Sequence, residues 1–366
     1  MDSKAVLVVA ASGRALAASA RRGGFLPLVA DYFADSDTIA LAHAHARLDD
    51  GLARGMTADA LDAAFAALTA GCEPRGIVCG TGFEDRPKLL AHIARRWKLF
   101  GNSADTVARL KDPLAFASLC EDLAIPHPAT TLSRPRDADG WLAKRRGGAG
   151  GSHVGPAGER SGDGTYYQRH VPGAPIALQF LADGQRARIL GSSAQWSAST
   201  LRQPFRYGGA VRPAALTDAG ALAACVQRIA AAIPLFGLNS ADFLVAEDGF
   251  RLLEINPRPS ATLDIFEPPG GSLFALHMSA CAGTLDFEAP NLPGAAAMAI
   301  VYAESELTIP ALDWPDWTAD RPHAGSAIKA GEPLCTVHAF APSATEARRL
   351  VDDRLATVLR WTSART

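Results

Sequence analysis

The sequence has 366 residues, enough for two to three domains at about 150 residues each. Hydrophobic residues make up 48% and charged residues 20%, a balance that supplies buried cores and excludes a disordered chain. Thirty-six Lys and Arg residues against 38 Asp and Glu give a net charge of −2, which argues against nucleic acid as the main partner because no general basic field is present.

Signals for export, membrane insertion and metal–thiolate sites are absent from the sequence. The apolar stretch 5–11 is far shorter than the roughly 20 residues of a membrane span. The first four residues do not begin an export signal. None of the six cysteines belongs to a Cys-x-x-Cys pair, which favours reduced, mostly buried thiols over a zinc or redox site. We therefore expect a cytoplasmic protein that does not bind membranes.

The first hundred residues alternate apolar strands with helices. Strands are expected at 4–11, 26–30 and 76–79, and helices at 15–22, 52–70 and 88–97. This alternation predicts a parallel sheet covered by helices on both faces. Ligands of such sheets bind at the carboxyl ends of the strands, where Ser12-Gly13 and 80–84 lie. Gly13 has no Gly-x-Gly partner, so the dinucleotide-binding fingerprint is missing.

The pattern changes after residue 103, to a mixture of α and β elements. A helix is expected over 105–123, strands at 141–145, 165–171 and 176–181, a helix at 222–233, and a hairpin of strands 241–246 and 250–255. Strands at 296–302 and 333–339 and a helix at 344–359 follow. The fold class is therefore α/β followed by α+β. The parts are an N-terminal α/β domain (1–103), a central domain (104–290) and a β-rich C-terminal region with a terminal helix (291–366).

The predicted hairpin carries the strongest chemical signal. Alternate residues of a strand share a face, so Leu252, Glu254 and Asn256 are expected to point the same way. Asp242 on the partner strand can lie opposite them. Two carboxylates and an amide oxygen suit Mg²⁺, and Arg258, one alternation further, can hold a phosphate oxygen. A hairpin whose polar positions face water is the alternative, but a glutamate between apolar residues needs a partner.

Lys144 precedes a glycine-rich loop, Gly147 to Ser152. Glycines allow backbone N–H groups to wrap a polyphosphate, and a nearby lysine neutralises it. The order differs from that of a P-loop, in which the lysine follows the glycines. A surface loop is the alternative. The magnesium-type hairpin about a hundred residues later favours phosphate binding.

Candidate acceptor-substrate residues are the arginines that cluster in a predicted loop, Arg202, Arg206 and Arg212. Three guanidinium groups there can bind substrate carboxylates or a phosphate, and a solvated charged loop is equally compatible. Gln195-Trp196 lies nearby and can stack a ring or belong to the core. His153 lies near the phosphates or at the surface.

The order of these parts resembles that of the ATP-grasp ligases over roughly residues 1–290. The resemblance is carried by Lys111, Lys144, the loop 147–152, the segment 168–173, Asp242 and the run Leu253-Glu254-Ile255-Asn256-Pro257-Arg258. In that family an N-terminal α/β domain precedes two lobes that clamp ATP. The resemblance therefore implies a small lobe at about 104–170 and a large lobe at about 171–290.

Carried over by position, the resemblance assigns a role to each motif. Asp242, Glu254 and Asn256 would bind Mg²⁺, for which Mn²⁺ can substitute. ATP would be bound by Lys111, Lys144, Gly150, Gly151, Ser152, Gln168, Arg169, His170 and Val171, of which the last four form the segment that receives the adenine. Lys144 and Arg258 would be catalytic. The family often has a glutamate where this chain has Gln168-Arg169-His170, and no acidic residue follows Pro172-Gly173 to take the ribose.

The resemblance also implies an activity. A substrate carboxylate would attack the γ-phosphate of ATP, giving an acyl phosphate and ADP, and an amine or thiol would then displace phosphate. Such catalysis needs placement and charge neutralisation but no protein nucleophile, and the sequence has no Gly-x-Ser-x-Gly elbow. The partners would be small-molecule carboxylates and amines. Dimers are common among such ligases, so a homodimer is compatible.

Two alternatives stay open at this point. The chain can be an ATP-binding regulatory module without turnover, or a biotin-carboxylase-like enzyme that activates bicarbonate, since its C-terminal region resembles the β-rich cap of such proteins. A narrower resemblance bears on the biosynthetic pathway in which this protein acts. The segments 82–87, 237–243 and 320–322 resemble ATP-grasp proteins that accompany the synthesis of tetrahydromethanopterin and methanofuran-type carriers in methylotrophs. This predicts a role in one-carbon cofactor biosynthesis.

Overall fold

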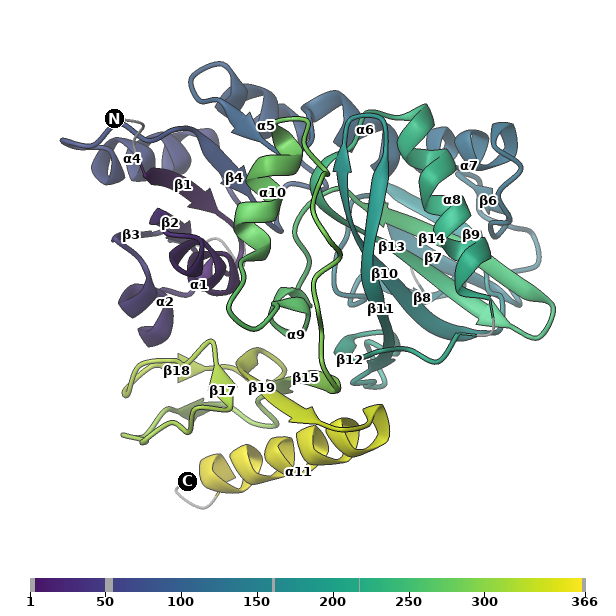
Figure 1. Ribbon diagram of the computed structural model, residues 1–366. Helices are drawn as coiled ribbons and strands as arrows, with labels where there is room; N and C mark the ends of the chain where they lie inside the picture. Colours follow the sequence, from purple (N-terminus) through teal and green to yellow (C-terminus); the bar gives the residue numbers. More distant parts are fainter. Residues whose placement is uncertain (1–3, 50–54, 160–161, 217, 364–366) are drawn as a thin grey trace.

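A computed structural model describes residues 4–49, 55–159, 162–216 and 218–363. The N-terminal part is a parallel five-stranded sheet with the order β3-β2-β1-β4-β5 (Figure 1). Its elements are β1 (Ala5–Val9), α1 (Arg14–Arg22), β2 (Leu26–Asp31), α2 (Ser36–Leu41), β3 (Ala44–Arg47), α4 (Ala58–Leu68), β4 (Ile77–Cys79), α5 (Pro87–Ala94) and β5 (Leu99–Phe100). Every residue of β1 is buried, as expected for a central parallel strand with both faces covered. The predicted parallel sheet is confirmed.

The second sheet is antiparallel, with the order β14-β13-β10-β11-β12-β15-β19-β17. Its strands are β10 (Ala174–Asp183), β11 (Ala187–Ser197), β12 (Tyr207–Arg212), β13 (Phe236–Ala246), β14 (Gly249–Asn256), β15 (Ala295–Tyr302), β17 (Thr318–Ala319) and β19 (Pro333–Ala341). Strands β15, β17 and β19 continue this sheet, so the C-terminal region shares it with the central hairpin. The sequence did not predict β11 and β12, which are rich in glycine, serine and alanine and pair with strands on both sides.

A smaller antiparallel sheet, β6-β9-β7-β8, faces the large one. Its strands are β6 (Thr130–Thr131), β7 (Trp141–Arg145), β8 (Val154–Pro156) and β9 (Thr165–Arg169); β16 (Leu307–Thr308) pairs with β18 (Ala327–Ile328). The remaining helices are α6 (Ala104–Lys111), α7 (Pro113–Asp122), α8 (Ala219–Ala232), α9 (Leu263–Phe266), α10 (Leu273–Cys281) and α11 (Ala344–Ser363).

The single helix predicted over 105–123 is two helices. Asp112 adopts an extended conformation and its carboxylate caps α7, of which Pro113 is the first residue. Proline suits that position because it lacks the N–H that a helix interior would require. The break leaves Lys111 at the end of α6, directed at the large sheet.

The two faces of the large sheet belong to different cores. Phe180 on β10 packs with α7 and α8, whereas the next residue, Leu181, packs with α1 and α10 on the opposite face. Helix α11 covers β15 and β19 (Figure 1). The N-terminal domain and the small sheet therefore lie over one face of the large sheet, and the helices α7, α8 and α11 lie over the other.

The carboxyl end of β1 is occupied by the chain's own carboxylates. The Ser12-Gly13 turn donates hydrogen bonds to Asp320 (3.0 Å) and Asp31 (2.9 Å). Arg14, which follows it, forms ion pairs with Asp264 and Asp320. Ser12 and Gly13 are not among the described residues that line the large cleft, and Arg14 ties the N-terminal domain to the central and C-terminal parts.

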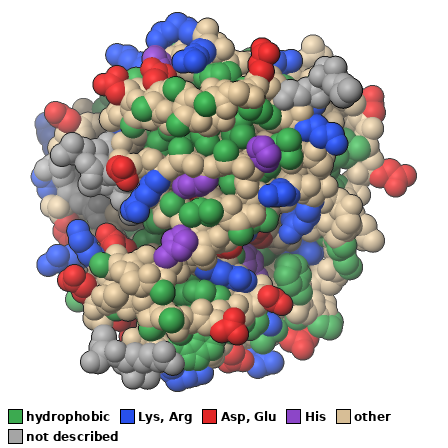
Figure 2. Space-filling model, turned by 90° about the vertical axis from the view of Figure 1, so that its left-hand side faces the viewer, with side chains coloured by type: hydrophobic (Ala, Val, Ile, Leu, Met, Phe, Trp, Pro, Cys, Tyr) green, Lys and Arg blue, Asp and Glu red, His purple; other side chains and the backbone are tan. Residues whose placement is uncertain are grey.

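Thiols, helix lengths and surface charge bear on the remaining expectations from the sequence. All six cysteines are free thiols, and three of them are buried. Within the described ranges, no helix combines the length and apolarity that a membrane span requires. Figure 2 shows basic and acidic side chains mixed over the face that the N-terminal domain contributes to.

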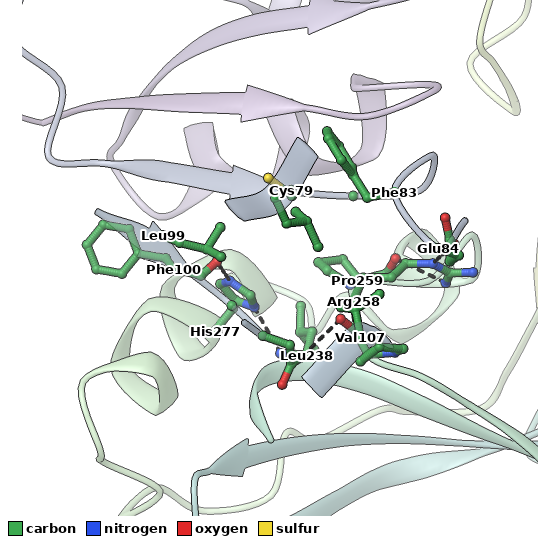
Figure 3. Close-up of a pocket in the computed structure, with 15 residues that line it drawn as sticks. Cys79, Phe83, Glu84, Leu99, Phe100, Val107, Leu238, Arg258, Pro259 and His277 are labelled. Atoms are coloured by element: carbon green, nitrogen blue, oxygen red, sulfur yellow. Dashed lines mark hydrogen bonds and ion pairs between the residues drawn. The ribbon is translucent and has the colours of Figure 1, made fainter. Parts of the chain in front are cut away.

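His277 on α10 links the N-terminal domain to the large sheet and gives a pH prediction. Its Nδ1 accepts a hydrogen bond from the N–H of Leu238 (2.9 Å), and its Nε2 donates to the carbonyl of Phe100 (3.1 Å) (Figure 3). Burial lowers its pKa from 6.5 to about 4. The unfolded chain thus binds this proton more tightly than the folded chain does.

We expect the contribution of His277 to the free energy of unfolding to be complete above pH 6.5 and to disappear as the pH falls through 4. The loss is on the order of 3 kcal/mol. Urea unfolding of the parent chain and of His277→Gln between pH 7.5 and pH 4.5 measures it, and the variant should respond less to pH. Equal pH dependence in both proteins would show that His277 does not titrate in this way.

Candidate active site

A cleft of about 1040 Å³ lies between the small sheet, the large sheet and the N-terminal domain. It is lined by Lys144, the glycine loop, the segment 168–173, the polar side chains of β13 and β14, and residues 81–86. Ligand pockets usually measure roughly 300–1,000 Å³, so this cleft has room for a large ligand such as a nucleotide together with a second molecule.

The three predicted metal ligands come together in this cleft. Asp242 on β13 lies opposite Glu254 on β14. The amide nitrogen of Asn256 donates to Asp242 Oδ2 (2.8 Å). Lys111 Nζ lies 2.8 Å from Glu254 Oε2 and 2.8 Å from Asn256 Oδ1, so the lysine from α6 joins the same cluster.

Leu252 was predicted to share a face of the strand with Glu254 and Asn256, but it points to the opposite face. The strand pairing shifts by one residue between Asp242 and Phe243, so β14 contains a β-bulge. Leu252 is fully buried in the core that the large sheet forms with α7 and α8, and Leu253 lines the cleft instead. The prediction for Leu252 is wrong because a bulge breaks the alternation on which it depends.

The electrostatics of the cluster favour a bound cation. Burial raises the pKa of Asp242, and the neighbouring carboxylate of Glu254 adds to this effect. Burial alone would also raise the pKa of Glu254, but the ammonium groups of Lys111 and Lys144 outweigh it and lower that pKa. In the present structure the positive charge among these oxygens is that of Lys111. Mg²⁺ also fits this donor set, because it prefers hard oxygen ligands.

The described part of the chain holds no group of three or more His, Cys, Asp or Glu side chains placed to bind a metal ion. Two carboxylates and one amide would leave several of the six positions around Mg²⁺ unfilled. A metal ion here would therefore need oxygen atoms from a ligand or from water.

Lys144 lies on β7 with its side chain in the cleft. Its Nζ donates to Gln168 Oε1 (3.1 Å) and lies 5.8 Å from the centre of the Tyr166 ring. Gln168 in turn donates to Thr130 Oγ1 (3.3 Å). The side chain of Gln168 is thus held between β6 and β7, close to the predicted phosphate lysine.

The glycine loop crosses the cleft from the N-terminal domain to β12. The carbonyl of Gly150 accepts a hydrogen bond from the N–H of Tyr207 (2.9 Å). Gly151 has φ +70°, and a Cβ atom there would lie 1.9 Å from the carbonyl oxygen of Phe205. A Cβ at Gly147 would lie 2.5 Å from Asp85 Cα. Any larger residue at these positions would push the loop away from both walls.

The two residues after these glycines lie at the edge of the cleft. Ser152 lines an adjoining cavity of about 510 Å³ together with Lys144. His153 is partly buried, and this burial lowers its pKa to about 4, so it is neutral at pH 7. His153 is partly exposed and lines the same adjoining cavity as Lys144.

The segment predicted to receive adenine lines the other end of the cleft. The N–H groups of Arg169 and His170 already donate to the carbonyls of Ala129 (2.8 Å) and Gly140 (2.9 Å). Val171 makes no backbone–backbone hydrogen bond with any described residue. Apolar side chains that the sequence analysis missed line the same region: Leu142, Val154 and Leu244.

Arg258 meets a carboxylate that the sequence analysis did not assign. Its Nε donates to Glu84 Oε1 (2.7 Å), and both side chains point toward one another in Figure 3. Glu84 also accepts the N–H of Gly82 (2.8 Å). Burial would raise the pKa of Glu84, but Arg258 and Lys111 outweigh it and lower that pKa. The sequence signals for Glu84 were its place after β4 and within the segment 82–87.

The predicted arginine cluster does not form a common site. Arg212 is buried and donates to the backbone carbonyls of Ile265, Leu292 and Gly294, so it fastens segments of the core together. Arg206 lies 3.8 Å from the centre of the Tyr302 ring, and Arg202 is exposed. The described residues that line the cleft include none of the three. The predicted loop is partly strand β12, which directs Arg212 inward.

Gln195 and Trp196 are neighbours on β11, so their side chains point to opposite faces of the large sheet. Gln195 faces the cleft and donates to Asp242 Oδ1 (3.3 Å). The ring of Trp196 packs on the far side of the sheet, 3.5 Å from the guanidinium carbon of Arg348 on α11. Trp196 is partly buried and packs against the core beneath α11, which favours the core interpretation, although the residue also borders the cleft.

Tyr207 gives a stability prediction. Its hydroxyl is buried without a hydrogen-bond partner in the described part of the chain, while its ring lines the cleft. A buried unsatisfied hydroxyl costs about 1–3 kcal/mol, so Tyr207→Phe should keep or raise the melting temperature of the ligand-free protein. Scanning calorimetry measures this. A clear decrease would mean that the hydroxyl has a partner in the free protein.

Residues 111–262 match the family model of the ATP-grasp domain. The chain contains an ATP-grasp domain. The match starts at Lys111 and ends just after the Glu254–Arg258 run, so it contains the predicted metal cluster and the glycine loop. None of the curated protein sequences matches this chain.

Solved structures share the fold of almost the whole chain. The biotin carboxylase domain of Hydrogenobacter thermophilus 2-oxoglutarate carboxylase, in complex with MgADP and bicarbonate, is similar with a TM-score of 0.72 and 14% identity, covering 98% of this chain and 89% of that one. N5-carboxyaminoimidazole synthase from Aspergillus clavatus, with ADP and 5-aminoimidazole ribonucleotide, gives 0.72 and 13%, covering 98% and 99%. The corresponding Staphylococcus aureus synthetase with ADP gives 0.69 and 14%, covering 97% and 98%. At these identities the likeness concerns the fold, and it confirms the predicted fold class.

Proposed function

We propose that this chain is an ATP- and Mg²⁺-dependent ligase that joins a carboxylate to an amine or thiol and releases ADP and phosphate. The supporting observation is that Asp242, Glu254 and Asn256 converge in a cleft that the glycine loop of an ATP-grasp domain lines, and that Lys111 contacts two of the three. Structures of the same fold were solved with MgADP or ADP. The proposal extends that chemistry to this cleft.

In this proposal the nucleotide lies along the cleft. The adenine packs among Leu142, Val154 and Leu244 and bonds the backbone at Val171, whose N–H and carbonyl have no backbone partner in the described residues. The phosphates run under the glycine loop toward Lys144. Gly150 and Gly151 allow the loop to approach a polyphosphate closely because they carry no side chain.

The reaction then proceeds in two displacements. An oxygen of the substrate carboxylate attacks the γ-phosphorus, the bond to the bridging oxygen breaks, and ADP leaves with the electron pair. The amine nitrogen or thiol sulfur attacks the acyl carbon, phosphate leaves, and the nucleophile loses a proton. When bound, Mg²⁺ supplies charge neutralisation at the phosphates. Lys144 and Arg258 neutralise and orient the transferring group, and Glu84 holds the Arg258 guanidinium in place.

An ADP-release screen tests this function. The full chain is given Mg·ATP with pairs of candidate carboxylates and amines, and ADP is expected only when a suitable carboxylate is present. Nucleotide binding without ADP formation from any pair would favour the regulatory module. ADP formation that is independent of any added carboxylate and persists in bicarbonate-depleted buffer would contradict a ligase.

Bicarbonate is a second candidate for the carboxylate. The observation in its favour is the similarity to the biotin carboxylase domain that was solved with MgADP and bicarbonate. If bicarbonate is the substrate, ADP formation should rise with added bicarbonate and fall in bicarbonate-depleted buffer. An acceptor amine would then receive the carboxyl group.

The proposed pathway is one-carbon carrier biosynthesis. It rests on the segments 82–87, 237–243 and 320–322, whose sequences resemble ATP-grasp proteins of that context. The screen should therefore begin with precursors of such carriers, with glutamate as the first amino-acid acceptor. We also propose a homodimer, which sedimentation of the full chain tests.

A further inference from the structure

We propose that Lys111 occupies the cation position of the metal site until a nucleotide draws it away, so that metal ion and nucleotide bind together and the metal ion alone binds only weakly. This inference rests on the proposed function, because it names how the same site is regulated. It concerns the order in which the two components can bind.

The contacts of Lys111 place its charge where a metal ion would bind. Its Nζ lies 2.8 Å from both Glu254 Oε2 and Asn256 Oδ1, two of the three proposed metal-binding atoms. The side chain of Lys111 is only 6% exposed, so water does not separate it from these oxygens. A divalent cation and this ammonium group cannot share the position, because both would need the same oxygen atoms.

Through Asn256, Lys111 also affects Asp242, the third proposed metal ligand, whose oxygen atoms are then taken up by hydrogen bonds. An ammonium group only donates hydrogen bonds, so Asn256 must turn its oxygen to Lys111 and its amide nitrogen away. That nitrogen donates to Asp242 Oδ2 (2.8 Å), and Gln195 donates to Asp242 Oδ1 (3.3 Å). Both oxygens of Asp242 therefore face N–H donors. Four oxygen atoms of the proposed metal site therefore already accept hydrogen bonds from protein donors: Asp242 Oδ1 and Oδ2, Glu254 Oε2 and Asn256 Oδ1.

A nucleotide changes this balance in two ways. Its phosphates offer Lys111 another anionic partner close by, since Lys111 ends α6 and its Nζ already reaches Glu254 and Asn256, which line the cleft. They also supply oxygen ligands that two carboxylates and an amide lack, because Mg²⁺ is usually held by few carboxylates together with phosphate oxygens. Without a nucleotide, the metal ion has no phosphate oxygens as ligands and must compete with the ammonium group of Lys111 for the same protein oxygens.

Binding of Mn²⁺, measured by electron paramagnetic resonance on the full chain, tests this inference without an activity assay. The parent chain should bind Mn²⁺ weakly alone and much more tightly when ADP is present. Lys111→Met should raise the affinity for Mn²⁺ alone by about tenfold or more, because a neighbouring positive charge is removed. Lys88→Met, an exposed lysine on α5, is the matched control and should leave that affinity unchanged.

Lys111→Gln is the second variant if Lys111→Met fails to fold, because its amide can still donate a hydrogen bond without the charge. Unchanged affinity for Mn²⁺ alone in a folded Lys111 variant overturns the inference, as does equally tight binding to the parent chain with and without ADP. Failure of ADP to bind any of these proteins would contradict the proposed function instead. The comparison of Mn²⁺ affinities without nucleotide would still decide the role of Lys111.

Discussion

Glu254→Gln is expected to lower the kcat for ADP formation by about 10²-fold or more, because it removes a charged oxygen from the site that neutralises the transferring phosphate. The amide oxygen of glutamine can still accept the hydrogen bond that Lys111 gives to Glu254 Oε2 at 2.8 Å, so the fold should persist. Steady-state kinetics with Mg·ATP, together with circular dichroism, measure both expectations.

Glu247→Gln provides the matched control, since Glu247 is exposed in the turn of the same hairpin. It should turn over at the parent rate. If Glu254→Gln also retains the parent rate, the carboxylate of Glu254 is not part of the metal site, and the assignment of Asp242 and Asn256 loses its main support.

Arg258→Met is expected to reduce both activity and stability. The substitution leaves the carboxylate of Glu84, which is 5% exposed, without the guanidinium that lies 2.7 Å away. Removing one partner of a buried ion pair typically costs about 3–5 kcal/mol. The substitution also removes a cation that the proposed reaction uses. Urea unfolding and the kcat for ADP formation measure the two losses.

The double variant Glu84→Gln with Arg258→Met separates these effects. It removes the unpaired charge, so most of the stability should return, whereas the activity should stay low. A single Arg258→Met variant as stable as the parent chain would show that the pair contributes little to folding. Recovery of activity in the double variant would show that Arg258 acts only as the partner of Glu84.

Features set by local periodicity could be predicted from the sequence. The apolar strands and helices of the first hundred residues predict the parallel sheet, because each element there follows its own hydrophobic pattern. The alternation in β14 also places Glu254 and Asn256 together, and the structure agrees. Strands β11 and β12 were missed because their small residues form a sheet only through their neighbours.

Features set by contacts between distant segments could not be predicted. Leu252 and Leu253 exchange places because of one bulge, which the sequence of β14 does not reveal. Arg212 resembles a substrate-binding arginine until the carbonyls of Leu292 and Gly294 are seen to surround it. Glu84 lies 174 residues from Arg258 in the chain, so only the fold shows that they are partners.

The central claim is that this cleft binds a metal–nucleotide complex at Asp242, Glu254 and Asn256. A crystal structure of the full chain grown with ADP and Mn²⁺, with anomalous data collected at the manganese edge, tests it most directly. We predict a manganese peak in contact with these three side chains, Lys111 displaced toward the phosphates, and the adenine against Val171. ADP bound outside the cleft, or manganese that contacts none of the three side chains, would contradict the account.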